Sequence, residues 1–302
     1  MPDKRHIGLP ELPAILVEEV VHAALREDFG RAGDITSQAT IPAGATATAI
    51  LSSREAGILC GLSIARGAFR LVDPAVKVST RMRDGDALKK GTRVAVISGN
   101  ARSILAAERV ALNFLMHLSG IASYTGRFQA EIAHTGARVT CTRKTLPGLR
   151  AFEKYAVKCG GGANHRFGLD DAILIKDNHI AVAGDVATAI RRARAFAGHL
   201  VKIEVEVTDL IQFREALAAG PDAILLDNMS VADMAKAVDV NRKHKGGSIK
   251  LEASGNVRLE TIRAIAETGV DYISTSKITM AAPTLDLGLD VMIRPTGSRR
   301  AK

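Results

Sequence analysis

The sequence contains no tryptophan, and aromatic residues make up only 4% of it. This scarcity argues against a protein that binds single-stranded nucleic acid, because such proteins stack bases on aromatic side chains. No uninterrupted apolar run approaches the roughly 18 residues of a membrane span. Residues 1–13 also lack the apolar region of a secretion signal. We therefore expect a cytoplasmic protein without a membrane partner.

Cysteine is scarce as well, since the chain has only Cys60, Cys141 and Cys159, with no metal-ligand spacing. An odd number of scattered cysteines fits a reducing compartment. We expect Cys141 and Cys159 to act as small hydrophobic residues. No Gly-x-Gly-x-x-Gly motif follows an early strand, which weakens a dinucleotide-binding interpretation.

Positive charge, in contrast, is plentiful. The 302 residues include 41 Lys and Arg against 32 Asp and Glu, a net charge of +9. Residues 138–166 hold seven basic side chains, one acidic side chain and three consecutive glycines. Such an excess indicates anionic partners, but nucleic acid, a membrane surface and small phosphates all qualify.

The first hundred residues predict a small α+β unit with a largely antiparallel sheet. Residues 13–30 have apolar side chains at helical spacing and end at a glycine. Residues 30–44 are rich in Gly, Pro, Asp, Ser and Thr, which is typical of a loop. Strand patterns follow at 45–61, 76–82 and 92–99. A long helical stretch then covers residues 101–136.

Beyond this stretch, six short β-rich runs mostly alternate with amphipathic helical segments. They are residues 137–142, 171–176, 202–207, 222–227, 248–253 and 270–276. This alternation predicts βα units and a parallel sheet. A full barrel has eight strands, so the pattern fits either an incomplete barrel or an open doubly wound sheet.

Nearly every one of these runs leads into polar residues that can take part in chemistry. The basic set is Arg143, Lys144, His165, Arg166 and Lys176, and the acidic set is Glu206, Asp227 and Glu252. Because the active sites of parallel α/β barrels lie at the carboxyl ends of the strands, we expect one shared site there. We expect Glu204 and Glu206 to point to opposite faces of their strand, so that only one faces the barrel interior.

The two sets predict the kind of ligand. Arg and Lys suit carboxylates and phosphates, and carboxylates that face phosphates suggest Mg²⁺. Ser254-Gly255-Asn256 and Thr275-Ser276 follow late strands and resemble a phosphate cradle of backbone donors. Chemistry alone thus predicts a compact polyanion and a phosphorylated, Mg²⁺-bound partner.

Residues 142–180, TRKTLPGLRAFEKYAVKCGGGANHRFGLDDAILIKDNHI, resemble the signature of the quinolinate phosphoribosyltransferase family. The segments AERVALNFLMHLSGIAS, EVEV, AILLDN, LEASGN and GVDYIS follow the order and spacing of the family. The resemblance covers nearly the whole chain. It implies an incomplete parallel α/β barrel of six to seven strands with an N-terminal α+β sandwich-like domain. The implied domains are residues 1–111 and 112–281, with residues 282–302 packed back on the first.

The resemblance also implies a reaction. The phosphoribosyl group of phosphoribosyl pyrophosphate would pass to quinolinate with decarboxylation, giving nicotinate mononucleotide, pyrophosphate and CO₂ in de novo NAD synthesis. Mg²⁺ would be the cofactor. The enzyme would be a homodimer with shared active sites, or a hexamer, with no nucleic-acid partner.

Residue roles follow from the same resemblance. Quinolinate would contact Arg109, Thr142, Arg143, Lys144, His165, Arg166 and Lys176. Phosphoribosyl pyrophosphate would contact Lys144, Lys176, Glu206, Asp227, Glu252, Ser254, Gly255, Asn256, Thr275, Ser276 and Lys277. Lys144, Lys176, Glu206 and Asp227 would be catalytic, with Glu206 and Asp227 near the metal, directly or through water. Arg109 would reach the site of a neighbouring subunit.

One segment departs from the family pattern. The family often has a Gly-Ala-Leu-Thr-His-Ser type of run after the last strand, where this chain has Thr275-Ser276-Lys277-Ile278-Thr279-Met280. Without the glycine, close backbone approach to a phosphate is harder. Lys277 either compensates with its charge or points to solvent.

Some side chains have simpler interpretations. Lys154 and Lys158 lie four residues apart in a predicted helix and are expected in solvent, as is Arg150. We expect His179 to orient a neighbour rather than react.

Three other functions remain open. The first is a transport-linked homologue of the same fold with a different acceptor. The second is a Schiff-base aldolase with Lys176 as nucleophile. The third is a basic RNA-binding protein, whose cations would form a surface stripe.

Overall fold

The computed structural model describes residues 9–244 and 249–294. Contacts divide the described chain into two compact units, each treated by itself below. The N-terminal unit holds residues 9–124, 151–160 and 282–294, and the barrel unit holds residues 125–150 and 161–281.

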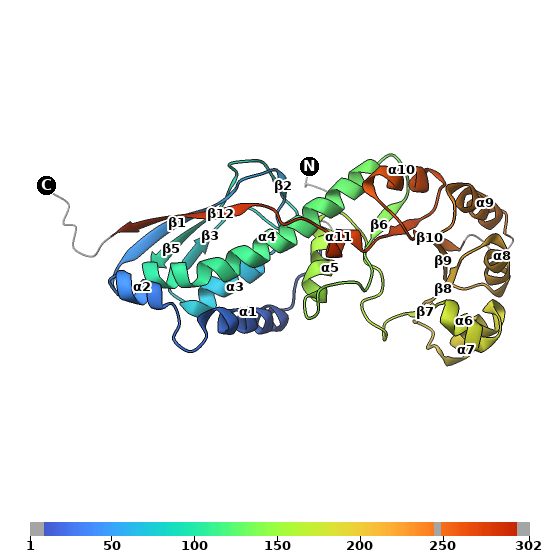
Figure 1. Cartoon of the computed structure of the whole chain (residues 1–302), viewed down its shortest axis with the longest axis horizontal. Coiled ribbons are helices and arrows are strands. Elements are labelled where there is room, and N and C mark those ends of the chain that lie inside the picture. The colour runs from blue at the N-terminus through green and yellow to red at the C-terminus, as the bar shows by residue number, and fades with distance from the viewer. Residues whose placement is uncertain (1–8, 245–248, 295–302) are drawn as a thin grey trace. The chain divides into compact units, whose positions relative to one another are not determined.

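The N-terminal unit is built on an antiparallel sheet of four strands in the order β12-β1-β5-β3. Their bounds are β12 Leu287–Arg294, β1 Thr46–Ser53, β5 Arg93–Asn100 and β3 Lys77–Ser79. A separate pair joins β2 Gly57–Ile58 to β4 Ala87–Leu88. Strands were predicted in the regions of β1, β3 and β5. Strand β12 was not predicted, although it pairs with β1 along its whole length (Figure 1).

Five helices begin in or belong to this part of the chain. They are α1 Ala14–Phe29, α2 Ile35–Thr40, α3 Leu62–Val72, α4 Ala101–Glu131 and α5 Arg150–Cys159. Helix α1 is the helix predicted over 13–30, and it buries Val17, Val21 and Leu25 at spacings of four residues. Helix α2 lies where a loop was predicted. It begins because the Asp34 carboxylate accepts a hydrogen bond from the backbone N of Ser37 at 2.9 Å.

Helix α4 is the one helix among the described residues that is long and apolar enough to cross a membrane, with a mean hydropathy of 1.3 over its most apolar 18 residues. The uninterrupted apolar runs of the sequence did not indicate this. However, 56% of that window is buried within the protein. The hydroxyls of Ser119 and Ser123 accept hydrogen bonds from the backbone N of Cys60 and Ile58 at 2.9 and 2.7 Å. These are the contacts of a core helix.

Helix α5 corrects the expectation of a solvated lysine face. Lys154 is buried and Lys158 is half-buried. The helix packs around most of its circumference and buries Glu153 as well, whose carboxylate lies 2.9 Å from His117 Nε2. A pair of lysines four residues apart therefore did not mark a surface here.

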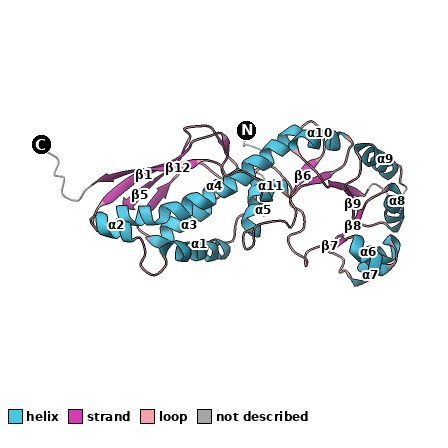
Figure 2. Cartoon of the chain, viewed as in Figure 1, coloured by secondary structure: helices cyan, strands magenta, loops and turns pink. Residues whose placement is uncertain are grey.

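The barrel unit contains all six predicted strands, now joined as one parallel sheet. Their order is β6-β11-β10-β9-β8-β7. Figure 2 draws strands in magenta and helices in cyan. The bounds are β6 Arg138–Thr140, β11 Tyr272–Ser274, β10 Lys250–Ser254, β9 Ala223–Asp227, β8 Ile203–Val207 and β7 Ile173–Ile175. Over the described residues, β6 and β7 do not pair with each other. The prediction of an incomplete parallel α/β barrel is confirmed.

Six helices follow the strands of the barrel unit. They are α6 Asp177–Ala183, α7 Val186–Phe196, α8 Leu210–Ala219, α9 Val231–Arg242, α10 Leu259–Glu267 and α11 Lys277–Met280. Side chains of Asp185, Asp209 and Ser230 cap the first turns of α7, α8 and α9. Helices α7 to α10 lie along the outer side of the sheet (Figure 1), so its inner side and the carboxyl ends of its strands remain for a ligand.

Gly120 of α4 provides a test of the N-terminal unit. A Cβ at this position would overlap the carbonyl oxygen of Pro283. Alanine normally stabilises a helix by about 1 kcal/mol relative to glycine. The overlap with backbone costs about 1–3 kcal/mol, so we expect Gly120→Ala to lower the urea midpoint of unfolding. Gly67→Ala in α3 is the matched control, since its Cβ would lie 3.4 Å from Val17 Cγ1, an ordinary contact. Gly67→Ala should keep or raise the midpoint. An unchanged or raised midpoint for Gly120→Ala, or equal midpoints for the two variants, would contradict this packing.

Candidate active site

The carboxyl ends of the six parallel strands surround a cavity of about 710 Å³ in the barrel unit. Its polar lining residues are Thr142, Arg143, Lys144, His165, Arg166, Lys176, Glu206, Asp227, Asn228, Glu252, Ser254, Asn256, Ser274, Thr275, Ser276 and Lys277. Gly255, Leu174, Leu225 and Val257 complete it. Each strand therefore contributes side chains from its last residues or from the loop that follows.

Every predicted site residue except Arg109 lines this cavity. Arg109 lies exposed on α4, within the N-terminal unit, and its predicted role stays a prediction. Sequence reasoning assigned no role to five lining residues, which are Leu174, Leu225, Asn228, Val257 and Ser274. Strand periodicity could have found Leu174 and Leu225, because each lies two residues before a predicted site residue and so shares its face.

One wall of the cavity carries Arg143, which lies on the loop after β6. Its Nε is buried and has no hydrogen-bond partner among the described residues. A buried donor without a partner costs free energy, so this guanidinium is suited to an anionic ligand. Arg150, expected in solvent, instead donates to Thr145 Oγ1 and to the carbonyl oxygens of Arg143 and Phe167 at 3.1–3.4 Å. It therefore supports the loop that presents Arg143.

Arg166 lies beside this wall. Its guanidinium donates to the carbonyl oxygen of Ala172 at 2.9 Å. Burial, together with the neighbouring positive charge of Arg143, lowers the pKa of Arg166 from its usual value. Two guanidinium groups close enough to repel each other are stabilised when an anion binds between or beside them.

Lys176 directly follows β7, and Glu206 lies on the neighbouring strand β8. The two form an ion pair, with 2.5 Å between Nζ and Oε2. The backbone N of Lys176 donates to His179 Nδ1 at 2.9 Å, so His179 orients the start of α6. The side chain of Lys176 is 46% exposed. A Schiff-base lysine is activated by an apolar pocket or by another cation, whereas Lys176 is paired with a carboxylate.

Glu204 and Glu206 correct an expectation from the sequence. They were expected on opposite faces of their strand, which was wrong, because residues two apart on a strand share a face. Both are half-buried on β8, between the buried Ile203, Val205 and Val207. The Oε2 atom of Glu204 lies 2.7 Å from His165 Nε2, so Glu204 also points into the barrel interior.

The loops after β9 and β10 are interlocked. Asn228 and Asn256 adopt left-handed backbone conformations with φ of 54° and 51°, which are uncommon for residues other than glycine. Asn256 Nδ2 donates to Asn228 Oδ1 at 3.2 Å, and the Asn228 backbone N donates to the Ser254 carbonyl oxygen at 2.9 Å. Gly255 has φ of 90°, and a Cβ there would overlap Asn228 Oδ1. Turns of this kind can direct backbone N–H groups toward an anion.

The segment that departs from the family pattern also reaches the cavity. Thr275, Ser276 and Lys277 all line it, so Lys277 does not point only to solvent. The Thr279 hydroxyl donates to the carbonyl oxygen of Lys144 at 2.7 Å. This bond ties the loop after β11 to the loop after β6, which carries Lys144.

Glu252 is buried deep in the barrel on β10. Burial and the nearby negative charge of Glu204 raise its pKa to about 8. Its Oε1 has no hydrogen-bond partner among the described residues and lies 3.7 Å from His165 Nε2. Near neutral pH this carboxyl is therefore largely protonated in the folded protein.

Together, fold and cavity define an α/β-barrel protein that holds anionic ligands at the ends of its strands. The basic side chains converge with carboxylates in one cavity, whereas an RNA-binding protein would present them as a surface stripe. The chain belongs to the quinolinate phosphoribosyl transferase family. Residues 34–119 match the N-terminal domain of this family, and residues 121–290 match its C-terminal domain.

Known proteins are similar in sequence and in structure to nearly the whole of this chain. The probable nicotinate-nucleotide pyrophosphorylase (carboxylating) of Bacillus subtilis is 43% identical, over 88% of this chain and 90% of that protein. The nicotinate-nucleotide pyrophosphorylase (carboxylating) of Mycobacterium leprae is 42% identical, over 90% and 96%. The solved structure of the nicotinate-nucleotide pyrophosphorylase from Francisella tularensis has a TM-score of 0.89 at 40% identity, covering 94% of this chain and 99% of that one.

The raised pKa of Glu252 predicts how stability depends on pH. Between the usual value of 4.5 and about 8, the folded state holds a proton that the unfolded state has lost. The contribution of Glu252 to the free energy of unfolding is thus fully present below pH 4.5 and is lost as pH rises to 8. We expect Glu252→Gln to gain stability relative to the parent as pH rises from 5 to 8. Urea midpoints at several pH values measure this, and a constant difference would contradict the raised pKa.

Proposed function

We propose that the protein transfers the phosphoribosyl group of phosphoribosyl pyrophosphate to quinolinate, with loss of CO₂. The products are nicotinate mononucleotide, pyrophosphate and CO₂, and the reaction belongs to NAD synthesis. The observation that carries the proposal is the convergence of basic and acidic side chains from all six strand ends in one cavity. The names of relatives at about 40% identity support the same reaction.

Quinolinate presents two adjacent carboxylates on a pyridine ring. Arg143 and Arg166 on one wall suit these groups, because guanidinium binds carboxylate with two parallel hydrogen bonds. The buried Arg143 Nε without a partner favours an anion at this place. We assign Lys144, which lies on the same loop as Arg143 and lines the same cavity, to both ligands.

Phosphoribosyl pyrophosphate needs donors for its 5′-phosphate and acceptors for its ribose hydroxyls. The loops that hold Ser254–Asn256 and Thr275–Lys277 supply backbone and hydroxyl donors, and Lys277 adds a charge. Glu206 and Asp227, at the ends of neighbouring strands, can accept hydrogen bonds from the ribose.

The reaction begins when the pyridine nitrogen attacks C1 of the ribose and pyrophosphate leaves, through a transition state with positive charge on the sugar. The carboxylates of Glu206 and Asp227 orient the ribose, while Lys144 and Lys176 offset charge on the leaving group. The 2-carboxylate then leaves as CO₂, because the adjacent cationic ring nitrogen stabilises the electron pair left behind on C2. This electron pair takes up a proton from water, which completes nicotinate mononucleotide. Positioning and electrostatics therefore supply most of the catalysis.

Mg²⁺ fits the donor set of the cavity. The ion usually binds one or two carboxylates together with substrate phosphates and water, and Glu206 and Asp227 are carboxylates at the ends of adjacent strands. When bound there, directly or through water, Mg²⁺ neutralises negative charge on pyrophosphate. This role for the cofactor is part of our proposal.

The proposal extends to assembly and location. A homodimer, or a hexamer built from dimers, would let Arg109 of one subunit serve the cavity of another, which fits the exposure of this arginine on α4. Burial of all three cysteines is compatible with a cytoplasmic enzyme. Two plant relatives are named mitochondrial and chloroplastic, so the compartment is a property to establish by fractionation.

A direct assay tests the reaction. Purified protein is mixed with phosphoribosyl pyrophosphate, Mg²⁺ and either quinolinate or nicotinate, and nicotinate mononucleotide is followed by ultraviolet absorbance. We expect product from quinolinate only, because the basic wall binds the 2-carboxylate that nicotinate lacks. Folded protein that yields no product from quinolinate would refute the proposal. Product from nicotinate alone would show a different acceptor on the same fold.

Lys144 provides a test of mechanism. We expect Lys144→Ala to lower kcat by about 100-fold or more, since one preorganised charge at a reacting centre contributes that much. Thermal unfolding should hardly change, because the side chain is exposed at the cavity. Lys236→Ala is the control, a lysine paired with Asp233 on the outer helix α9. Activity of Lys144→Ala within a few-fold of the parent would remove this lysine from the mechanism.

A further inference from the structure

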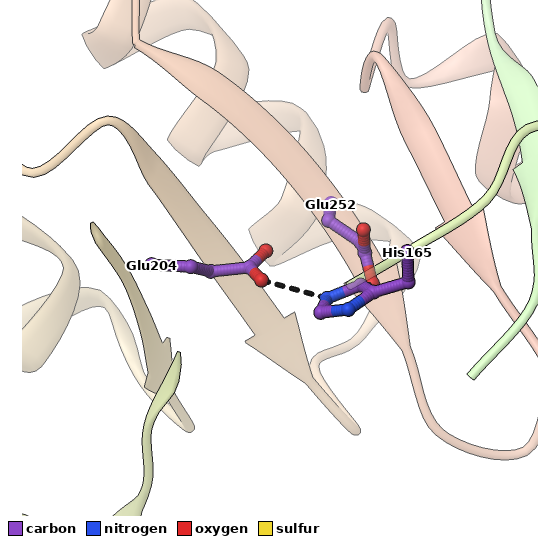
Figure 3. A group of neighbouring side chains, drawn as sticks. All are labelled: His165, Glu204 and Glu252. Atoms are coloured by element: carbon purple, nitrogen blue, oxygen red, sulfur yellow. Dashed lines mark hydrogen bonds and ion pairs between the residues drawn. The ribbon is translucent and has the colours of Figure 1, made fainter. Parts of the chain in front are cut away.

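Three side chains meet in the interior of the barrel unit, where Figure 3 shows His165 between Glu204 and Glu252. His165 Nε2 lies 2.7 Å from Glu204 Oε2 and 3.7 Å from Glu252 Oε1. The candidate ligand atoms of the three residues all lie within 4.8 Å of one another. His165 and Glu252 line the cavity described above, whereas Glu204 lies behind them.

Hydrogen bonds fix the tautomer of His165. The backbone N of Arg166 donates to Nδ1 at 2.8 Å, so Nδ1 carries a lone pair and no hydrogen. The hydrogen of the neutral ring is therefore on Nε2, which donates it to Glu204. A doubly protonated ring would place the N–H of Nδ1 against the N–H of Arg166. The contact with the Arg166 N–H therefore favours a neutral imidazole with its hydrogen on Nε2.

The same hydrogen argues against a metal ion at this cluster. A histidine binds a metal through a nitrogen lone pair, and here the Nε2 lone pair is replaced by the bond to hydrogen while Nδ1 already accepts one. Glu204 Oε2 is in turn occupied as the acceptor of that hydrogen. A chain of hydrogen bonds thus runs from the Arg166 backbone through the ring to Glu204.

We propose that Glu204 is a positioning residue for the substrate cavity. It holds the His165 ring in one tautomer and one orientation, and the ring in turn holds the backbone of Arg166, whose guanidinium lines the cavity. The positive charge that meets the substrate then comes from Arg143 and Arg166, and His165 contributes a neutral, fixed ring. The kinetic part of this inference rests on the proposed function.

Two substitutions separate a hydrogen-bonding role from simple filling of space. The amide oxygen of Glu204→Gln can still accept from Nε2, so the tautomer and the ring orientation should persist. Glu204→Leu keeps comparable bulk but removes the acceptor of the 2.7 Å hydrogen bond from Nε2. Glu267→Gln is the matched control, since Glu267 also meets a histidine, His134, at 3.0 Å, but on the exposed surface of the same unit.

The Michaelis constants for quinolinate and for phosphoribosyl pyrophosphate are then measured separately for each variant. We expect Glu204→Leu to raise the constant for quinolinate about tenfold and to change that for phosphoribosyl pyrophosphate less than about twofold. Glu204→Gln should stay within about threefold of the parent for both substrates, and Glu267→Gln should match the parent. An unchanged quinolinate constant in Glu204→Leu, or equal damage by Gln and Leu, would overturn the proposal.

A spectroscopic measurement keeps the inference testable even if the protein lacks the proposed activity. Nitrogen-15 NMR of the ligand-free protein at pH 7.5, with His165 assigned by His165→Gln, reports which ring nitrogen carries hydrogen. We expect hydrogen on Nε2 in the parent and in Glu204→Gln, and loss of this single form in Glu204→Leu. Hydrogen on Nδ1 in the parent would refute the positioning role. So would a stoichiometric divalent metal that elemental analysis finds in the parent and not in Glu204→Gln.

Discussion

The parallel arrangement of six strands is the constraint on which the rest of the barrel unit depends. Because all strands run in one direction, the residue that follows each strand arrives at the same end of the sheet. Lys176, Asp227 and Thr275 are far apart in sequence and reach one cavity for this reason alone. The helices on the outer side supply the apolar burial that keeps the strands in register, so the site itself is free to be almost wholly polar.

Charge is balanced locally within this polar site. Lys176 is paired with Glu206, and the guanidinium of Arg166 bonds a backbone carbonyl, yet a buried atom of Arg143 has no partner within the described chain. The cations are thus held in place by contacts that leave part of their hydrogen-bonding capacity for a ligand. Glu252, with its pKa near 8, keeps the interior from gathering a further full negative charge at neutral pH.

Much of the barrel unit could be predicted from sequence because strands and loops differ sharply in polarity. Each of the six β-rich runs lies on an observed strand, and each brings a polar residue to the cavity, either near its end or directly after it. Alternation of side chains along a strand, applied correctly, would also have placed Glu204 inside. What periodicity could not supply was the partner of each side chain, such as the bond between His165 and Glu204, which joins residues 39 positions apart.

Other errors arose where tertiary contacts override local pattern. Lys154 has the spacing of a surface residue, but its helix is enclosed on most sides. The sequence of β12 was not recognised as a strand, and its pairing partner β1 lies near the other end of the chain. Helix α2 depends on one capping bond from Asp34 in a segment whose composition is that of a loop. The burial of Lys154, the pairing of β12 and the start of α2 each depend on a contact that the composition of the segment does not identify.

The interlocked loops after β9 and β10 have a consequence for how this protein can change. Gly255 leaves no space beside Asn228, and the two asparagines share a hydrogen bond while both occupy an uncommon backbone conformation. A larger residue at either position displaces the other, so neither loop can be exchanged alone. Redesign of this rim of the cavity, by evolution or in the laboratory, must therefore replace both loops together.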